Sequence, residues 1–271
     1  MSIFTSLAAP FRRKPDQSRP SLLLLCLESR ALLSLASLPL ASPLLRRALP
    51  RGDGHAVMLL PGLLAGDAST VPLRRFLKKQ GYQAHGWQQG RNLGPRSELM
   101  PALRARLEQL ARDSGGKVSL VGWSLGGIYA RELARAAPHL VRQVVTLGSP
   151  LYGAPGRGSN AWAVYRLFNE KPSAGLRGDT PPPVPTTSIY SRSDGIVGWG
   201  CSVERDGEQA DNIDIPAASH LGLGVNPLVW YALGDRLAQA DGAWRPFRPR
   251  GLSILLYPFN VTARRRANHK E

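Results

Sequence analysis

The fold of this chain is decided by the stretch Val118-Ser119-Leu120-Val121-Gly122-Trp123-Ser124-Leu125-Gly126-Gly127. Its first four residues form an apolar run typical of a buried strand, and a helical pattern follows from Ile128 to Ala137. Between them lies a Gly-x-Ser-x-Gly pentapeptide centred on Ser124. Glycines beside a serine permit a tight, strained turn, because they carry no side chain that would clash with nearby backbone. We therefore predict a strand, a sharp turn that presents Ser124, and a helix.

A glycine-rich turn can also carry a serine without a catalytic role. Ser124 is a candidate nucleophile only if the chain also supplies a base and an acid. A serine hydroxyl becomes a nucleophile when a base removes its proton, and a carboxylate in turn orients that base. Three histidines follow Ser124 in the chain. His139 follows the end of the helix predicted from Ile128 to Ala137, and His269 lies in a basic tail. This leaves His220, in a loop before the last helix. We predict His220 as the base, and a surface-loop histidine is the alternative.

The orienting carboxylate is expected after a strand that lies between Ser124 and His220. Asp194 meets this condition in the run Ile189-Tyr190-Ser191-Arg192-Ser193-Asp194-Gly195-Ile196-Val197, where an apolar strand gives way to a polar turn. The alternative is a turn-capping aspartate, since Asp-Gly is a common turn pair. The competing acids follow less clear strands: Asp179, Glu204, Asp206, Asp211 and Asp214.

Two backbone N–H groups should stabilise the oxyanion that forms when the serine attacks a carbonyl. One belongs to Leu125, the residue after the nucleophile, at the positive end of a helix dipole. The other should come from a loop after an early strand, and Leu60-Pro61-Gly62-Leu63-Leu64 is suited to this. We predict Leu63 as the second donor.

Apolar runs alternate with amphipathic runs from residue 55 onward. The expected strands are 55–60, 82–87, 118–121, 141–147, 187–190 and 212–215. The expected helices are 70–80, which ends at Gly81, then 97–112, 128–137, 160–169 and 227–240. This alternation predicts βαβ units. The fold class is therefore α/β, with a mostly parallel sheet, helices on both faces and a small cap insertion.

Composition agrees with a globular α/β protein and indicates no metal or cofactor. The 271 residues are 43% hydrophobic, with 28 Gly and 23 Pro. Cys26 and Cys201 have no motif spacing, and two free thiols are the simplest interpretation. The net charge of +16 is concentrated at the ends, with +3 in residues 1–20 and +6 in residues 245–271. No basic and aromatic residues interleave as in base-stacking proteins, so we expect no specific nucleic-acid partner.

Residues 21–49 form a leucine-rich helical segment that charges and prolines interrupt. Glu28, Arg30, Pro39 and Pro43 leave its longest uncharged run short of the about 20 residues that a spanning helix needs. On a helical wheel, one face holds Leu24, Leu25, Ala31, Leu32 and Leu35. Glu28 falls inside this stripe, which suits a packed site with a partner. We expect a helix that packs on the domain or lies on a membrane surface, with a cleaved signal as the alternative.

The remaining segments complete the expected organisation. Residues 1–20 are expected to be a disordered basic terminus, 50–245 the main domain, and 246–271 a basic tail. A cap of about 151–186 interrupts the main domain. Trp162, Tyr165 and Phe168 recur every three residues in this cap, so that they share one helical face. They either line a pocket for an acyl group or anchor the cap on the core.

With these motifs in their order, the chain resembles the α/β-hydrolase superfamily, and its bacterial lipase and esterase branch in particular. The resemblance covers roughly residues 50–245. It implies a cofactor-free hydrolase that uses Ser124, Asp194 and His220. One departure is Pro61, where many lipases have histidine, and this weakens an assignment to the true triglyceride lipases.

The function expected from the residues and the resemblance is cleavage of carboxylic esters with hydrophobic acyl groups, through an acyl-enzyme. A thioesterase or amidase with the same residues is an alternative, and so is a silent scaffold associated with membranes. The expected partners are a small-molecule or lipid ester and a membrane surface, touched through residues 21–49 or the basic tails. We expect a cytoplasmic protein at the inner membrane surface, with a secreted or periplasmic protein as the alternative.

Overall fold

A six-stranded parallel sheet lies at the centre of the computed structural model, which describes residues 17–153, 158–169, 180–250 and 253–258. The strand order is β2-β1-β3-β4-β5-β6, and every neighbouring pair is parallel. The strands are β1 Ala56–Leu60, β2 Gln83–Gly86, β3 Val118–Trp123, β4 Val141–Leu147, β5 Thr186–Tyr190 and β6 Ala210–Asp214. The expected α/β fold class is confirmed.

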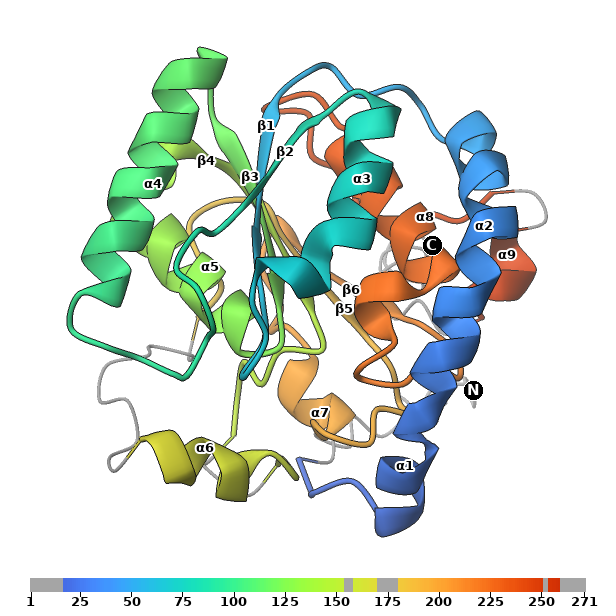
Figure 1. Cartoon of the computed structure of the whole chain (residues 1–271). Coiled ribbons are helices and arrows are strands. Elements are labelled where there is room, and N and C mark those ends of the chain that lie inside the picture. The colour runs from blue at the N-terminus through green and yellow to red at the C-terminus, as the bar shows by residue number, and fades with distance from the viewer. Residues whose placement is uncertain (1–16, 154–157, 170–179, 251–252, 259–271) are drawn as a thin grey trace, which may run out of the picture.

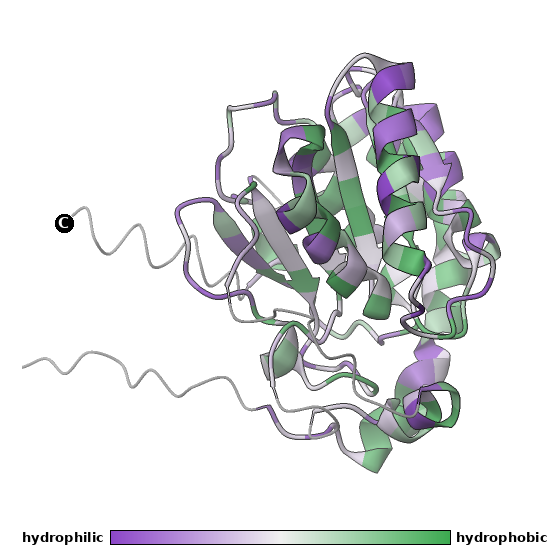
Figure 2. Cartoon of the chain, turned by 90° about the vertical axis from the view of Figure 1, so that its left-hand side faces the viewer, coloured by the Kyte–Doolittle hydropathy of each residue, from purple (hydrophilic) through white to green (hydrophobic). Residues whose placement is uncertain are grey.

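Helices cover both faces of the sheet (Figure 1). On one face lie α3 Val71–Gln80 and α8 Pro227–Leu237, and on the other α4 Leu99–Ser114 and α5 Leu125–Ala136. Side chains alternate along a strand, so β1 serves two cores: Val57 and Leu59 pack on the α3 side, and Met58 and Leu60 on the α4 side. Figure 2 shows strands with hydrophobic stretches at the centre, surrounded by helices on which hydrophobic and hydrophilic residues alternate.

Short elements gather beyond the carboxyl ends of the strands, at the bottom of Figure 1. Among them are α6 Trp162–Phe168 and α7 Trp199–Ser202, and the 3-10 turn η4 Leu223–Val225 precedes α8. Two further 3-10 turns, η2 Asp67–Thr70 and η3 Pro138–Leu140, precede α3 and β4. Loops at this edge are the usual place for functional groups in α/β folds, so the architecture directs attention there.

The observed helices begin and end within a few residues of the expected ones. Gly81 caps α3 in the left-handed conformation, with a φ of 110°. The largest change at a helix start is at α5, which begins at Leu125 rather than at Ile128. Its first turn contains Gly126 and Gly127, and glycine's low helix propensity conceals a helix from a sequence pattern.

The leucine-rich segment is helical from Leu22 to Ala48, as α1 Leu22–Cys26, a 3-10 turn η1 Leu27–Arg30, and α2 Ala31–Ala48. By length and composition alone, this helix could cross a membrane. It packs instead along the outside of α8 and α3 (Figure 1). Pro39 and Pro43 lie within α2 on its exposed side, where water can satisfy the carbonyl groups that lose a partner.

The expected packing face of this helix is wrong in part. Leu32 and Leu35 lie on the predicted face, yet Leu32 is 68% exposed and Leu35 is 46% exposed. The residues turned toward the domain are Leu24, Glu28, Ala31, Ser34, Leu38, Ala41 and Leu45. This helix carries leucines on all of its faces, so the hydrophobicity of the sequence could not identify the face that packs on the domain. Glu28, which is buried, marks the correct one.

The core extends beyond residue 245, where the sequence pattern placed the end of the domain. Phe247 and Tyr257 are buried in the core on the α8 side, and a short helix, α9 Ser253–Leu256, lies between them. The Phe247 N–H donates to Asp211 Oδ2 over 2.5 Å. Residues 259–271 of the expected tail lie outside the described chain.

The expected disorder of residues 1–20 falls mostly outside the described residues, which begin at Gln17. That residue and its neighbours make ordered contacts: the Asn160 side-chain amide donates to Pro20 O over 3.2 Å, and Gln17 O lies 3.8 Å from Cys201 Sγ. The expected cap of 151–186 contains α6, while residues 154–157 and 170–179 of it are not described.

Candidate active site

Ser124 occupies a strained turn between β3 and α5, as its glycine neighbours predict. Its φ is 53° and its ψ is −122°, a conformation that costs a residue with a side chain on the order of 1–3 kcal/mol. The Ser124 N–H donates to Leu147 O over 2.8 Å, which ties the turn to the end of β4. A side chain at Gly126 would collide with the carbonyl of Leu60. The half-buried serine is therefore held at the carboxyl edge of the sheet.

Asp194 and His220 come together at this same edge. Asp194 lies in the turn after β5, here called the acid loop (residues 191–197), and His220 lies in the histidine loop (residues 218–222) after β6. The His220 Nδ1 is 2.7 Å from Asp194 Oδ2, and both side chains are buried. The other carboxylate oxygen accepts from the N–H groups of Ile196 and Val197 at 2.8 and 2.7 Å. The carboxylate is thus anchored by its own loop and oriented toward the imidazole.

Burial and charge oppose each other at His220. Burial by itself lowers the pKa of the ring, while the charge of Asp194, its hydrogen bond and the charge of Glu28 raise that pKa, which ends above its ordinary value. When Asp194 is ionised, Nδ1 carries the hydrogen that it accepts. The Nε2 atom is then the ring nitrogen that can accept a proton.

Gly148 and Trp123 link the surroundings of Ser124 to those of the Asp194–His220 pair. Gly148 follows Leu147, whose carbonyl holds the serine turn, and a Cβ at Gly148 would lie 3.0 Å from Asp194 Oδ2 and 3.1 Å from His220 Nδ1. The indole N–H of Trp123, next to the serine, donates to His220 O over 3.2 Å. The three residues selected from the sequence therefore converge on one edge of the sheet.

The loop 61–65 carries the predicted donor Leu63, is called the oxyanion loop for that prediction, and approaches the serine. A Cβ at Gly62 would lie 3.2 Å from Ser124 Cβ, which is a tight contact, so glycine favours this close approach. The N–H of Leu64 donates to Asn92 O and that of Ala65 to Gly62 O, which fixes the backbone around Leu63. Leu125 is the first residue of α5, where backbone N–H groups have no acceptor within the helix. The two segments that carry the predicted donors, Leu63 and Leu125, thus both lie close to Ser124.

Asn92 is a residue that the sequence did not single out. It is fully buried, its side-chain amide donates to Pro61 O over 2.8 Å, and its carbonyl oxygen accepts from the Gly94 N–H. A buried amide with these partners holds the oxyanion loop in place. It lies 31 residues from Pro61, in a loop without a motif, so no local signal identifies it.

The predicted cap residues do not share one environment. Tyr165 is buried in the core on the α4 side, and Trp162 packs against that core with its ring 5.3 Å from that of Tyr165. Phe168 is half exposed. These positions agree with anchoring by Trp162 and Tyr165, whereas Phe168 is free to meet a ligand.

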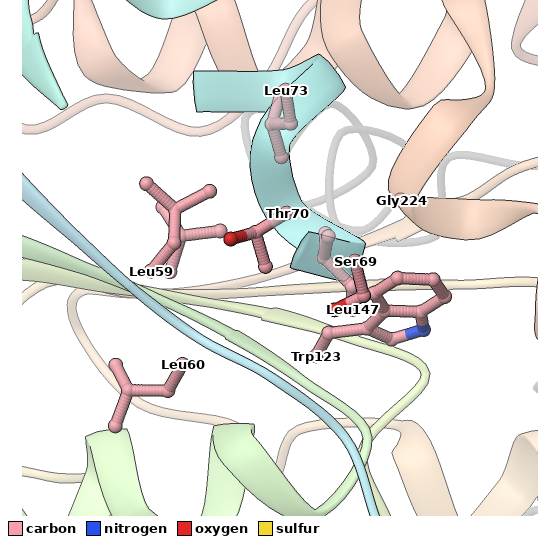
Figure 3. Close-up of a pocket in the computed structure, with 9 residues that line it drawn as sticks. Leu59, Leu60, Ser69, Thr70, Leu73, Trp123, Leu147 and Gly224 are labelled. Atoms are coloured by element: carbon pink, nitrogen blue, oxygen red, sulfur yellow. The ribbon is translucent and has the colours of Figure 1, made fainter. Parts of the chain in front are cut away.

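A small apolar pocket lies behind the serine turn, on the α3 side of the sheet (Figure 3). It is lined by Leu59, Leu60, Ser69, Thr70, Leu73, Val121, Trp123, Leu147 and Gly224. The Trp123 ring extends across it toward Gly224. Ser124 does not line this pocket, so we attribute it to packing around Trp123 rather than to substrate binding.

A second serine, histidine and aspartate form a chain of contacts at the opposite edge. His55 Nδ1 lies 2.5 Å from Asp53 Oδ1, and its Nε2 lies 2.8 Å from Ser119 Oγ. Burial lowers the pKa of His55. Ser119 is fully buried within β3, so a substrate cannot reach its hydroxyl. Contacts among a serine, a histidine and an aspartate are therefore not enough to identify Ser119 as a nucleophile.

The described residues contain no group of three or more His, Cys, Asp or Glu that could hold a metal ion. Cys26 is exposed and Cys201 is buried, and neither forms a disulfide. The two free thiols agree with the simplest interpretation of their sequence positions.

The parallel sheet and the arrangement of Ser124, Asp194 and His220 at its carboxyl edge are those of an α/β-hydrolase fold. The chain is similar to solved structures with that fold. Aspergillus fumigatus lipase B is 19% identical with a TM-score of 0.56, over 74% of this chain and 58% of that one. Bacillus licheniformis lipase BlEst2 is 19% identical with a TM-score of 0.53, over 70% and 94%. A pyrethroid hydrolase from Sphingobium faniae is 18% identical with a TM-score of 0.51, over 68% and 97%. The α/β-hydrolase fold expected from the motifs is confirmed.

Sequence similarity to a curated protein is more limited. The serine hydrolase BPHL of Mus musculus is 33% identical over 114 residues, which are 37% of this chain and 38% of that protein. This chain therefore matches little more than a third of that relative's length, and it spans 58% of the fungal lipase. No model of a known protein family matches the chain.

Proposed function

We propose that the protein is a serine hydrolase that cleaves carboxylic esters with hydrophobic acyl groups. The observation that carries this proposal is the buried Asp194–His220 pair at the same edge of the sheet as a strained, half-buried Ser124. The similarity to a serine hydrolase and to two lipases supports the same class of reaction. No cofactor is needed for this chemistry.

The reaction begins when His220 Nε2 takes the proton of Ser124 Oγ as that oxygen attacks the ester carbonyl carbon. The carbonyl electrons move to the oxygen, and the N–H groups of Leu63 and Leu125 stabilise the oxyanion. Collapse of this intermediate breaks the bond to the alcohol, which leaves with the proton from His220. Water then attacks the acyl-serine carbonyl carbon with the same histidine as base. The bond to Ser124 Oγ breaks, that oxygen takes the proton from His220, and the acid is released.

Exposed apolar side chains near the site favour a hydrophobic ester. Leu167 and Phe168 project from α6, and Leu221 directly follows His220. Leu167 is 80% exposed, so an apolar ligand that covered it would gain free energy from its burial. An acyl chain or a lipid surface would do so.

Covalent labelling with a fluorophosphonate tests the nucleophile. We expect the wild-type protein to be labelled and Ser124→Ala to lose the label. Ser119→Ala is the matched control, because Ser119 also contacts a histidine but is inaccessible. Equal labelling of wild type and Ser124→Ala contradicts the assignment.

A panel of chromogenic esters, acyl thioesters and anilides separates the enzyme classes. Ester hydrolysis with little turnover of the others supports the proposal, and a preference for thioesters or anilides assigns the same residues to a thioesterase or amidase. A folded wild-type protein that neither labels nor hydrolyses is the silent scaffold.

We also propose that the protein works at a membrane surface, on which the helix of residues 22–48 lies in the plane. Its outward face bears the exposed side chains of Leu22, Leu23, Leu32, Leu33, Leu40 and Leu44. Only Glu28 and Arg30 are charged between residues 20 and 45, and both bond to the domain. Arg19 lies just before this helix, and Arg46 and Arg47 lie in its last turn, so that basic side chains at both ends can meet anionic headgroups.

Spanning the bilayer would require this helix to leave the domain and to place the carboxylate of Glu28 in hydrocarbon, which is costly. An in-plane position keeps its contacts with α8 and α3. The net charge of +16 suits the anionic inner leaflet, which would make the protein cytoplasmic and peripheral. Flotation with anionic and zwitterionic vesicles at low salt tests this. Flotation with the anionic vesicles is expected, whereas no flotation, or a dimer held together by this face, contradicts it.

A further inference from the structure

Glu28 is a buried carboxylate that accepts from backbone N–H groups of two distant segments. It lies in η1, the 3-10 turn between α1 and α2, and is 5% exposed. Its Oε1 accepts from the N–H of Gly195 over 2.8 Å and from that of His220 over 2.9 Å, and its Oε2 accepts from that of Leu221 over 2.8 Å. Three charge-assisted bonds compensate for the loss of water around this buried charge.

These donors belong to the two loops that carry the candidate base and acid. Gly195 directly follows Asp194 in the acid loop, and His220 itself donates from the histidine loop. A single carboxylate therefore bridges the backbones of both loops at the point where their side chains form the 2.7 Å Asp194–His220 contact. Where the loops leave the sheet, they are also linked by the Ile215 N–H, which donates to Tyr190 O over 2.7 Å, and by the ion pair of Arg192 with Asp214. Glu28 adds a link beside Asp194 and His220 themselves.

The amino-terminal helix contacts the acid loop at two further points. The Arg30 side chain donates to Ser193 O over 2.9 Å, so Glu28 and Arg30 bind either side of Asp194. A Cβ at Gly195 would collide with the backbone of Leu24 and Leu25 in α1. Glycine is thus required here for a close approach of the helix, in addition to leaving room around the carboxylate.

We propose that Glu28 is a positioning residue, which sets the acid loop and the histidine loop relative to each other and thereby aligns Asp194 with His220. The kinetic consequence rests on the proposed function, whereas the alignment does not. An error of about 1 Å in such an alignment can cost about 100-fold in rate. The charged groups on the segments around His220 are Asp194 and Arg192 in the acid loop, and Glu28 and Arg30 in the helix.

The test uses three substitutions in the full chain. Glu28→Gln keeps the size of the side chain and removes its charge, Glu28→Asp keeps the charge on a shorter side chain, and Glu28→Ala removes both. Glu108→Gln is the matched control, because it removes the charge of a glutamate on α4 that forms a surface ion pair with Arg104. Melting temperatures identify any variant that fails to fold, in which case the Gln and Asp substitutions carry the test.

Two measurements follow. For Glu28→Gln and Glu28→Ala we expect kcat on an ester to fall roughly 10- to 100-fold with little change in KM. NMR titration of the His220 ring, assigned with His220→Ala, should show a lower pKa in Glu28→Gln, a smaller change in Glu28→Asp and none in Glu108→Gln. Loss of the negative charge near the ring disfavours its protonated form, which gives this direction.

Wild-type kcat and wild-type His220 titration in Glu28→Gln would overturn the proposal. A lower melting temperature with unchanged kcat and unchanged His220 titration would also overturn it. That result is expected if Glu28 only holds the helix on the domain. The titration needs no turnover. A wild-type protein that does not react with fluorophosphonate therefore contradicts the proposed function alone, and the shift at His220 still decides the role of Glu28.

Discussion

At the scale of single residues, the proposed function predicts that the ionisation of His220 controls the activation of Ser124. The base works in its neutral form, and the surroundings raise the pKa of the ring above 6.5, its ordinary value. As the pH falls through this raised pKa, the ring becomes protonated and can no longer accept the serine proton. Activity should therefore be lost on the acid side at a pH above 6.5.

The measurement is kcat/KM for a soluble ester across pH. We expect an acid limb with a midpoint above 6.5, and in Asp194→Asn a lower midpoint with a rate about 10,000-fold lower. A wild-type midpoint at or below 6.5 would show that the Asp194–His220 contact does not govern the base.

Exposure to solvent distinguishes Ser124 from Ser119, a serine that also lies close to a histidine. Ser119 contacts His55 at 2.8 Å, and His55 contacts Asp53, yet Ser119 is enclosed in β3. Ser124 lies after the end of the same strand, in a turn with a positive φ. The strained backbone moves its hydroxyl to the edge of the sheet, and this difference in position separates a candidate nucleophile from a structural serine.

At the scale of elements, the outward face of α2 should control membrane binding without contributing to stability. Substitution of Leu32, Leu33 and Leu40 by serine removes three side chains that each gain roughly 1.5–3 kcal/mol on burial in lipid. We expect the fraction bound to anionic vesicles to fall more than tenfold, with an unchanged melting temperature.

Leu38→Ser provides the control on the opposite face of the same helix, because Leu38 is buried against the domain. It should lower the melting temperature and leave vesicle binding intact as long as the protein is folded. Equal vesicle binding by wild type and the triple variant would argue that the exposed leucines have another role.

At the scale of the whole molecule, the carboxyl-terminal segment completes the core on the α8 side. Phe247 is fully buried beside Tyr231 and Tyr257. Phe247→Ala should destabilise the protein by about 3–5 kcal/mol, because it leaves a cavity in the core. Urea unfolding measures this loss.

Leu255→Ala is the matched control from the same segment. Leu255 is 77% exposed, so its substitution should change the free energy of unfolding by no more than about 0.5 kcal/mol. A small effect of Phe247→Ala would mean that the segment contributes little and that the domain ends near residue 245, as the sequence pattern predicted.

The sequence by itself determined the class of fold and the three principal candidate residues. Alternating apolar and amphipathic runs depend on local periodicity, which is why the strands and the helices α3, α4 and α8 were located within a few residues. Ser124 was located because its turn needs glycines at adjacent positions. His220 and Asp194 were selected by their order in the chain after Ser124, and the structure brings these two side chains into contact.

Only the tertiary structure decided what depends on distant partners. Glu28 contacts Gly195 and His220 across 167 and 192 residues, and Asn92 holds Pro61 across 31. The outward face of the leucine-rich helix and the burial of Phe247 were likewise set by packing. A sequence pattern reports which face of an element is apolar. It does not report which segments the folded chain places beside that element, and these contacts determine which polar groups can be buried and which apolar ones stay exposed.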